Sequence, residues 1–270
     1  MSKNLKVFCI TALLFVSMGF ISRANAVTLD LWTEGSSGTI NGAIYQQLDV
    51  AHAGTGVLDP FVRLQVPEGK GTEDGYNTDA RPLLYTDVNN SVQFTHDLQL
   101  SDLQNNIVSA GGISYYEFLL DINQKNQNTK DKDDNHNGVI DFNEIDPDKL
   151  LTLDQLKIYL STSGDQNVNI SALGIPIYDL GANNILLNAG LSHGSGVGDM
   201  SALIPTSRFG TDFTKYVYFY SEFGTLYANN DGFEEWGERS EGVIPEPASL
   251  SLLGLGLLGL LGFRKFKSEV

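Results

Sequence analysis

The chain is short of cysteine and of basic residues. Its single cysteine, Cys9, lies in an apolar N-terminal segment, so the rest of the chain can form no internal disulfide. Lys and Arg number 17 against 33 Asp and Glu. Without the two terminal segments described below, residues 27–241 keep 11 basic and 31 acidic residues, a net charge of −20. This charge argues against nucleic acid and anionic lipid as partners, and it favours divalent cations.

The N-terminus has the three parts of a secretory signal. Lys3 and Lys6 precede an apolar run over residues 7–21, and Ala24-Asn25-Ala26 supplies the small residues that signal peptidase requires. A buried helix and a retained membrane anchor are the alternatives, but the run is short and ends in a cleavage sequence. We therefore expect residues 1–26 to be a signal peptide and the exported protein to begin at Val27.

The C-terminus also has three parts. Pro245, Glu246 and Pro247 lead into a Leu- and Gly-rich apolar stretch over residues 248–263, and basic residues follow within residues 264–267. Sixteen residues at about 1.5 Å each give a helix of about 24 Å, shorter than the roughly 30 Å hydrocarbon core of a bilayer. The sequence predicts a single transmembrane helix that is short for a permanent anchor. The basic residues favour a cytoplasmic C-terminus, with the domain outside the inner membrane.

This tail closely resembles the PEP-CTERM sorting signal, over residues 244–267. The resemblance implies recognition by an exosortase, a membrane transpeptidase-like enzyme that cuts near Pro245, Glu246 and Pro247. The protein would then pass only transiently through the inner membrane and finish at the cell surface or in the extracellular matrix of a Gram-negative cell, where biofilm matrix is one setting. A simple tail anchor is the alternative, and the segment length allows it.

Apolar residues alternate with polar residues in several short runs between turn clusters, which is typical of half-buried strands. No run of twelve or more residues shows helical spacing, and 28 glycines suit tight turns. We predict an all-β fold, an antiparallel β-sandwich or jelly roll, formed as one domain by residues 27–241. The alternating apolar positions include Leu29, Leu31, Val62, Leu64, Tyr116, Phe118, Leu120, Ile122, Leu156, Ile158, Leu160, Val217 and Phe219.

Residues 133–144 match the pattern of an EF-hand calcium loop. Gly138 permits the sharp turn, and Ile140 is expected to pack inward and hold the loop to the core. Oxygen ligands recur at the spacing that lets the chain curl around one cation. The predicted calcium ligands are Asp133, Asn135, Asn137, the backbone carbonyl of Val139, Asp141 through a water, and Glu144 through both carboxylate oxygens.

The flanks of this loop differ from those of an EF-hand. Residues 124–132 lack an apolar stripe, and Pro147 interrupts a helix soon after the loop. We expect a lone EF-like loop in a hairpin connection between the strands at 116–122 and 151–160, with calcium affinity of roughly 0.1–1 mM, as in extracellular modules. An Asp- and Asn-rich surface turn is the alternative interpretation.

Catalytic patterns are weak. The four histidines lack metal-ligand spacing, and no Gly-x-Ser-x-Gly sequence occurs. The Gly-rich residues 194–198 lack the Lys-Ser/Thr of a phosphate loop and predict a turn. A glycosidase carboxylate pair would need a separation that sequence does not supply, and solvent-facing strand positions account for the candidates. These are Asp97, Glu117, Asp154 and Glu222.

Several segments also look like a set shared by uncharacterised PEP-CTERM exported proteins, a resemblance that implies no activity. They are residues 54–61, 75–79, 117–124, 194–200 and 230–236. We expect no enzyme but a structural or adhesive surface protein stabilised by calcium. A carbohydrate-binding module for extracellular polysaccharide is the first alternative, provided that Trp236 and Tyr216, Tyr218 or Tyr220 form an exposed stacking platform. A secreted glycoside hydrolase or lyase is the second.

Overall fold

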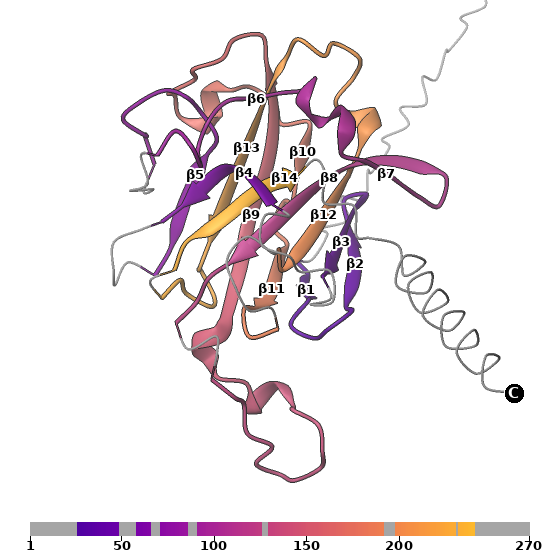
Figure 1. Cartoon of the computed structure of the whole chain (residues 1–270), viewed down its shortest axis with the longest axis vertical. Helices are drawn as coiled ribbons and strands as arrows, with labels where there is room; N and C mark the ends of the chain where they lie inside the picture. Colours follow the sequence, from indigo (N-terminus) through magenta and orange to yellow (C-terminus); the bar gives the residue numbers. More distant parts are fainter. Residues whose placement is uncertain are drawn as a thin grey trace, which may run out of the picture.

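The protein is an all-β sandwich (Figure 1). The computed structural model describes residues 26–48, 58–65, 71–85, 91–125, 129–191, 198–230 and 232–240. Over these residues it contains two mostly antiparallel sheets and short 3₁₀ turns, with no α-helix. The predicted fold class is therefore confirmed. Of the predicted signal peptide only Ala26 is described, and the Pro-Glu-Pro motif and the predicted transmembrane helix lie outside the described residues.

The first sheet is built around β9 (Leu150–Ser161) and β13 (Tyr216–Phe223), which pair antiparallel. The strand order is β1-β11-β9-β13-β5, with β10 on β9 and β6 on β13. The pair β1–β11 is parallel. The remaining bounds are β1 (Thr28–Asp30), β11 (Asn184–Asn188), β5 (Glu73–Tyr76), β10 (Tyr178–Asp179) and β6 (Leu98–Gln99).

The second sheet is built around β8 (Ile113–Ile122), which pairs with β12, β14 and β7. The strand order is β2-β3-β12-β8-β14-β4. Its other strands are β2 (Ser37–Ile40), β3 (Ala43–Gln47), β12 (Met200–Pro205), β14 (Glu234–Arg239), β4 (Leu58–Leu64) and β7 (Ile107–Ala110). The 3₁₀ turns are η2 (Asp102–Asn105), η3 (Phe142–Glu144), η4 (Pro147–Lys149), η5 (Ile170–Ala172) and η6 (Thr206–Arg208).

One apolar core fills the space between the sheets. Val217 and Phe219 of β13 are fully buried, as the period-two pattern predicted, and Phe223 of the same strand is fully buried as well. Trp236 of β14 lies 4.7 Å from the Phe219 ring, and its indole N–H donates to Ser221 Oγ at 3.2 Å. This bond joins the two sheets, because Ser221 belongs to β13 and Trp236 to β14.

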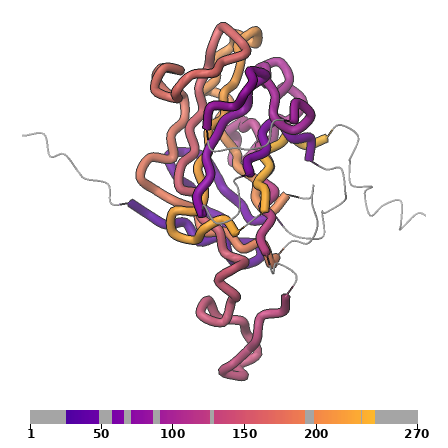
Figure 2. Tube along the Cα trace, turned by 90° about the vertical axis from the view of Figure 1, so that its left-hand side faces the viewer, coloured from indigo at the N-terminus to yellow at the C-terminus, as the bar shows by residue number. Residues whose placement is uncertain are grey.

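The connection between β8 and β9 is not the predicted hairpin. β8 belongs to the second sheet and β9 to the first, so the chain passes from one layer to the other between them. Figures 1 and 2 both show residues 129–149 extending beyond one end of the sandwich. The hairpin prediction failed because alternation locates strands but does not say which strands pair. The candidate calcium loop therefore lies at one end of the sandwich, on a crossover between its layers.

Candidate metal centre

The first half of the 133–144 loop curls around the side chain of Asp133. This carboxylate accepts hydrogen bonds from the backbone N–H of Asn137 at 3.0 Å and of Gly138 at 2.7 Å. Gly138 has φ of 83°, which only glycine adopts readily. The side-chain oxygens of Asn135 and Asn137 accept from backbone N–H groups two residues on. The first three predicted ligands thus lie on the inside of one tight turn.

The second half of the loop closes on the first. Asp141 accepts hydrogen bonds from the side-chain amides of Asn135 at 2.8 Å and Asn137 at 3.1 Å. Glu144 accepts from the backbone N–H of Asn135 at 3.1 Å and of Asp141 at 2.9 Å, and with Asp141 it forms a capping box on η3. Five predicted side-chain ligands are therefore joined in one network, while Val139 is 60 % exposed and contributes its backbone only.

The loop is attached to the sandwich through Phe142 rather than Ile140. Ile140 is 37 % exposed, so the prediction that it packs into the core is wrong. The ring of Phe142 lies 5.3 Å from that of Trp32 and 6.2 Å from that of Tyr227. The anchoring aromatics come from segments distant in sequence, which is why the loop pattern alone did not reveal the contact.

A buried ion pair holds the base of the loop. Lys149 is 2 % exposed, and its ammonium lies 2.9 Å from a carboxylate oxygen of Asp131. The same oxygen accepts the backbone N–H of Asp146 at 3.0 Å. Asn230 donates to the carbonyl oxygen of Asp148 at 2.6 Å. The residues on both sides of the loop are thus fixed to each other and to the chain that leads into β14.

The four carboxylates considered for catalysis do not form one site. Glu117 lies 3.0 Å from the guanidinium of Arg239, and Asp154 accepts the backbone N–H of Thr225 at 2.7 Å. Burial raises the pKa of Asp154 and, with nearby Asp74, that of Glu222. Glu117 is in the second sheet, whereas Asp154 and Glu222 are in the first. Asp154 also raises the pKa of Glu222, so these two carboxylates are neighbours, whereas Glu117 lies apart from them.

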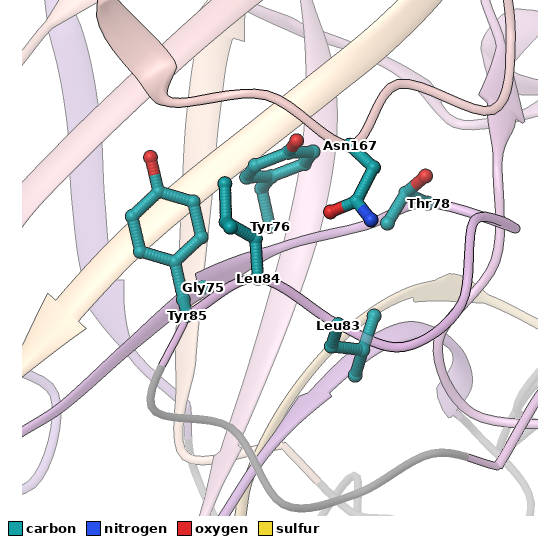
Figure 3. A pocket seen from close by; sticks show the side chains of 7 residues that line it. All are labelled: Gly75, Tyr76, Thr78, Leu83, Leu84, Tyr85 and Asn167. Atoms are coloured by element: carbon teal, nitrogen blue, oxygen red, sulfur yellow. The ribbon is translucent and has the colours of Figure 1, made fainter.

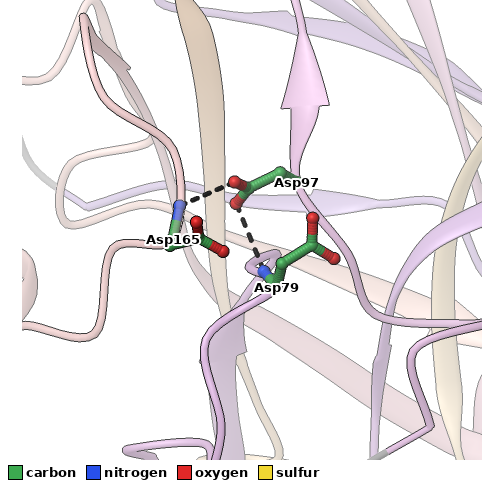
Figure 4. A group of neighbouring side chains, drawn as sticks. All are labelled: Asp79, Asp97 and Asp165. Carbon is green, nitrogen blue, oxygen red and sulfur yellow. Dashed lines mark hydrogen bonds between the residues drawn. The ribbon is translucent and has the colours of Figure 1, made fainter.

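Three aspartates form a cluster that the sequence did not indicate (Figure 4). The carboxylate oxygens of Asp79, Asp97 and Asp165 lie within 4.8 Å of one another. Asp97 accepts the backbone N–H of Asp165 at 2.7 Å and of Asp79 at 3.3 Å. Burial raises the pKa of Asp97. These bonds account for the cluster as a tie between two loops, and it was missed because its members come from three separate segments.

The aromatic platform that the carbohydrate-binding alternative requires is absent from the described residues. Trp236 is fully buried between the sheets, and Tyr218 and Tyr220 are covered as well. These tyrosines pack with Tyr76 and Tyr85 on the outer face of the first sheet, under the loops around residues 78–85 and 163–173. The hollow beside them, of about 10 Å³, has room for about one water molecule and is too small for a sugar ring (Figure 3). The condition set for the carbohydrate-binding alternative is therefore not met by these residues.

The two described histidines, His96 and His136, belong to no group of possible metal ligands. His96 bonds the backbone carbonyls of Asp97 and Pro60, and His136 bonds that of Asp134. His52, His193 and residues 194–197 of the Gly-rich segment lie outside the described residues. Among the described residues no helix is long and apolar enough to cross a membrane.

Comparison with known proteins identifies one segment. Residues 243–265 match the family model of the PEP-CTERM protein-sorting motif. The chain thus carries the motif that marks exosortase substrates for export and sorting to the cell surface, which confirms the resemblance seen at Pro245, Glu246 and Pro247. No curated protein and no solved structure matches the chain.

Proposed function

We propose that this exosortase substrate is a calcium-stabilised β-sandwich with a structural or adhesive role at the cell surface or in the extracellular matrix. The observation that supports calcium is the loop network, in which Asp133, Asn135, Asn137, Asp141 and Glu144 already share hydrogen bonds. Calcium prefers six to eight oxygen ligands in a flexible arrangement, and such a loop supplies them. Extracellular calcium modules bind with dissociation constants of roughly 0.1–1 mM, which is the affinity expected of this single loop.

Catalysis is not part of the proposed function. The candidate carboxylates are engaged with separate structural partners, such as Arg239 with Glu117 and Thr225 with Asp154. The loop lies at one end of the sandwich and is joined to it by Phe142 and the ion pair of Asp131 with Lys149. An ion bound there would neutralise crowded carboxylates and hold the crossover between the layers. The role proposed for the bound ion is thus mechanical.

Calorimetry on the processed, exported protein tests calcium binding. We expect a binding event with a dissociation constant of roughly 0.1–1 mM that Glu144→Gln weakens at least tenfold, because the substitution removes one oxygen of the closing carboxylate. Asp134→Asn is the matched control, since Asp134 is exposed and lies in the loop but is not a predicted ligand. Equal titrations of the native protein and Glu144→Gln would contradict the proposal.

Cell fractionation tests the sorting part. We expect the native protein at the surface or in the medium, shortened at its C-terminus, and replacement of Glu246 by Ala to leave it uncut in the membrane fraction. Cells that lack their exosortase should show the same uncut form. Recovery of the full-length chain in the cytosol of normal cells would refute export.

A further inference from the structure

Glu234 is a carboxylate inside the sandwich. It is 0 % exposed and pairs in register with Leu64 of β4 and Ile122 of β8, both core residues. Trp236, two residues further along β14, lies on the same face and in the core. The side chain of Glu234 therefore points between the sheets, at the end of the apolar core.

One oxygen of this carboxylate has a partner and the other has none. Oε2 accepts the side-chain amide of Asn229 at 2.7 Å. Oε1 is buried and has no hydrogen-bond partner in the structure. No ion pair with Glu234 is found among the described residues, and the guanidinium groups of Arg63 and Arg239 pair with Glu235 and Glu117. A buried carboxylate without a counter-charge is strongly unfavourable, so this position calls for a cation or a proton.

A second buried carboxylate comes from the opposite sheet at the same end. Glu73 is 1 % exposed and pairs with Phe223, a core residue of β13. Tyr76, three residues later in β5, lies in the tyrosine cluster on the outer face, so alternation places Glu73 on the inner face. Asn229, which bonds Glu234, also donates its backbone N–H to the carbonyl oxygen of Gly71 at 2.9 Å.

We propose that a calcium ion binds between the two sheets here, held by the carboxylates of Glu234 and Glu73 and the amide oxygen of Asn229. Buried carboxylate and amide oxygens are the hard ligands that calcium prefers. The ion supplies the positive charge that Arg63 supplies to Glu235 on the other face of the same strand. It also ties β5 of one sheet to β14 of the other. This site is separate from the 133–144 loop, so either site can fail alone.

The Glu144→Gln protein separates the inner site from the loop, because that substitution weakens calcium binding by the loop at least tenfold. The calcium effects that Glu234→Gln or Glu73→Gln then removes from this background belong to the inner site. Titrated with calcium chloride, the processed Glu144→Gln protein is expected to bind one equivalent of calcium and to show a melting temperature higher by about 3 °C or more in 10 mM calcium than in chelator. Adding Glu234→Gln, or Glu73→Gln, is expected to remove both effects. Glu235→Gln is the matched control, since Glu235 is as buried on the same strand but faces away from the core; it should keep them.

The outcomes separate the two sites. No calcium equivalent and no calcium-dependent shift in the Glu144→Gln protein overturns the inner site, whatever the loop does. Residual binding that survives both Glu234→Gln and Glu73→Gln also overturns it. If circular dichroism shows that the Glu234→Gln variant is unfolded, two measurements still decide whether the inner site exists. They are the calcium-dependent melting shift of the Glu144→Gln protein and the loss of that shift when Glu73→Gln is added.

Discussion

Calcium should protect the connection between β8 and β9 from protease while leaving the strands intact. Lys130 and Lys132 are exposed trypsin sites just before the loop, whereas Lys149, just after it, is 2 % exposed and serves as an internal reference. Without a cation the carboxylates of Asp133, Asp141 and Glu144 repel one another, and the loop should open more often. Cleavage at the two exposed lysines should then accelerate in chelator.

The magnitude follows from the expected affinity. With a dissociation constant of roughly 0.1–1 mM, 10 mM calcium raises the free energy of unfolding by about 1.4–2.7 kcal/mol. In a domain of this size that is a rise in melting temperature of about 3–11 °C, provided that the loop unfolds together with the sandwich. Phe142 on Trp32 and Asp131 on Lys149 supply that coupling. The loop contribution is the shift in the native protein minus the shift in Glu144→Gln.

Two measurements check this reasoning together. Differential scanning calorimetry reports global unfolding, and trypsin with mass spectrometry reports local opening at Lys130 and Lys132. If calcium slows cleavage without moving the melting temperature, the loop opens alone and the Phe142 contact does not couple it to the core. If chelator changes neither quantity in the native protein, the stabilising role of the loop is refuted.

Three further predictions concern the sandwich. Arg63→Ala leaves Glu235, 2 % exposed, without its cation and should cost about 3–5 kcal/mol in urea unfolding, whereas a loss below about 1 kcal/mol would show that the pair is dispensable. Burial raises the pKa of Glu238 to about 7, so the folded state binds the carboxyl proton of Glu238 more tightly than the unfolded state does. The stabilisation that comes from binding this proton is fully present below about pH 4 and is lost as the pH rises through 7. Glu238→Gln should therefore exceed the native protein in stability above pH 7 by up to about 3 kcal/mol, and equal pH profiles would contradict this. Tyr45→Phe removes the 2.6 Å bond to the Tyr178 hydroxyl and should cost about 1 kcal/mol in the same unfolding assay, while an unchanged midpoint would speak against it.

The alternation of apolar residues was enough to place the central strands. The patterns at Phe118, Ile158 and Phe219 correspond to β8, β9 and β13. The same pattern predicted that Glu117 faces solvent, yet it is 8 % exposed. Its carboxylate is matched by Arg239 and by the hydroxyl of Ser201 at 3.0 Å, and a partner of that kind depends on tertiary contacts.

The pairing of the strands could not be predicted from the local alternation of apolar and polar residues. β14 lies between β8 and β4, which are far from it in the chain. The alternation of apolar residues within a strand does not show which distant strands will pair with it. The same limit applies to sites. The candidate ligands of the 133–144 loop could be predicted from their spacing within twelve residues, whereas the inner site proposed for Glu73 and Glu234 depends on the packing of two sheets.

The position of β14 decides how the domain would bear load. The sorting segment follows this strand in the chain, and β14 is hydrogen-bonded along both edges, to β8 and to β4. Tension from a C-terminal tether would run along the axis of β14. It would load the hydrogen bonds to β8 and to β4 in parallel, so that these bonds would have to break together and not one after another. A domain fastened at that end would resist flow far better than one pulled from a peripheral strand such as β1.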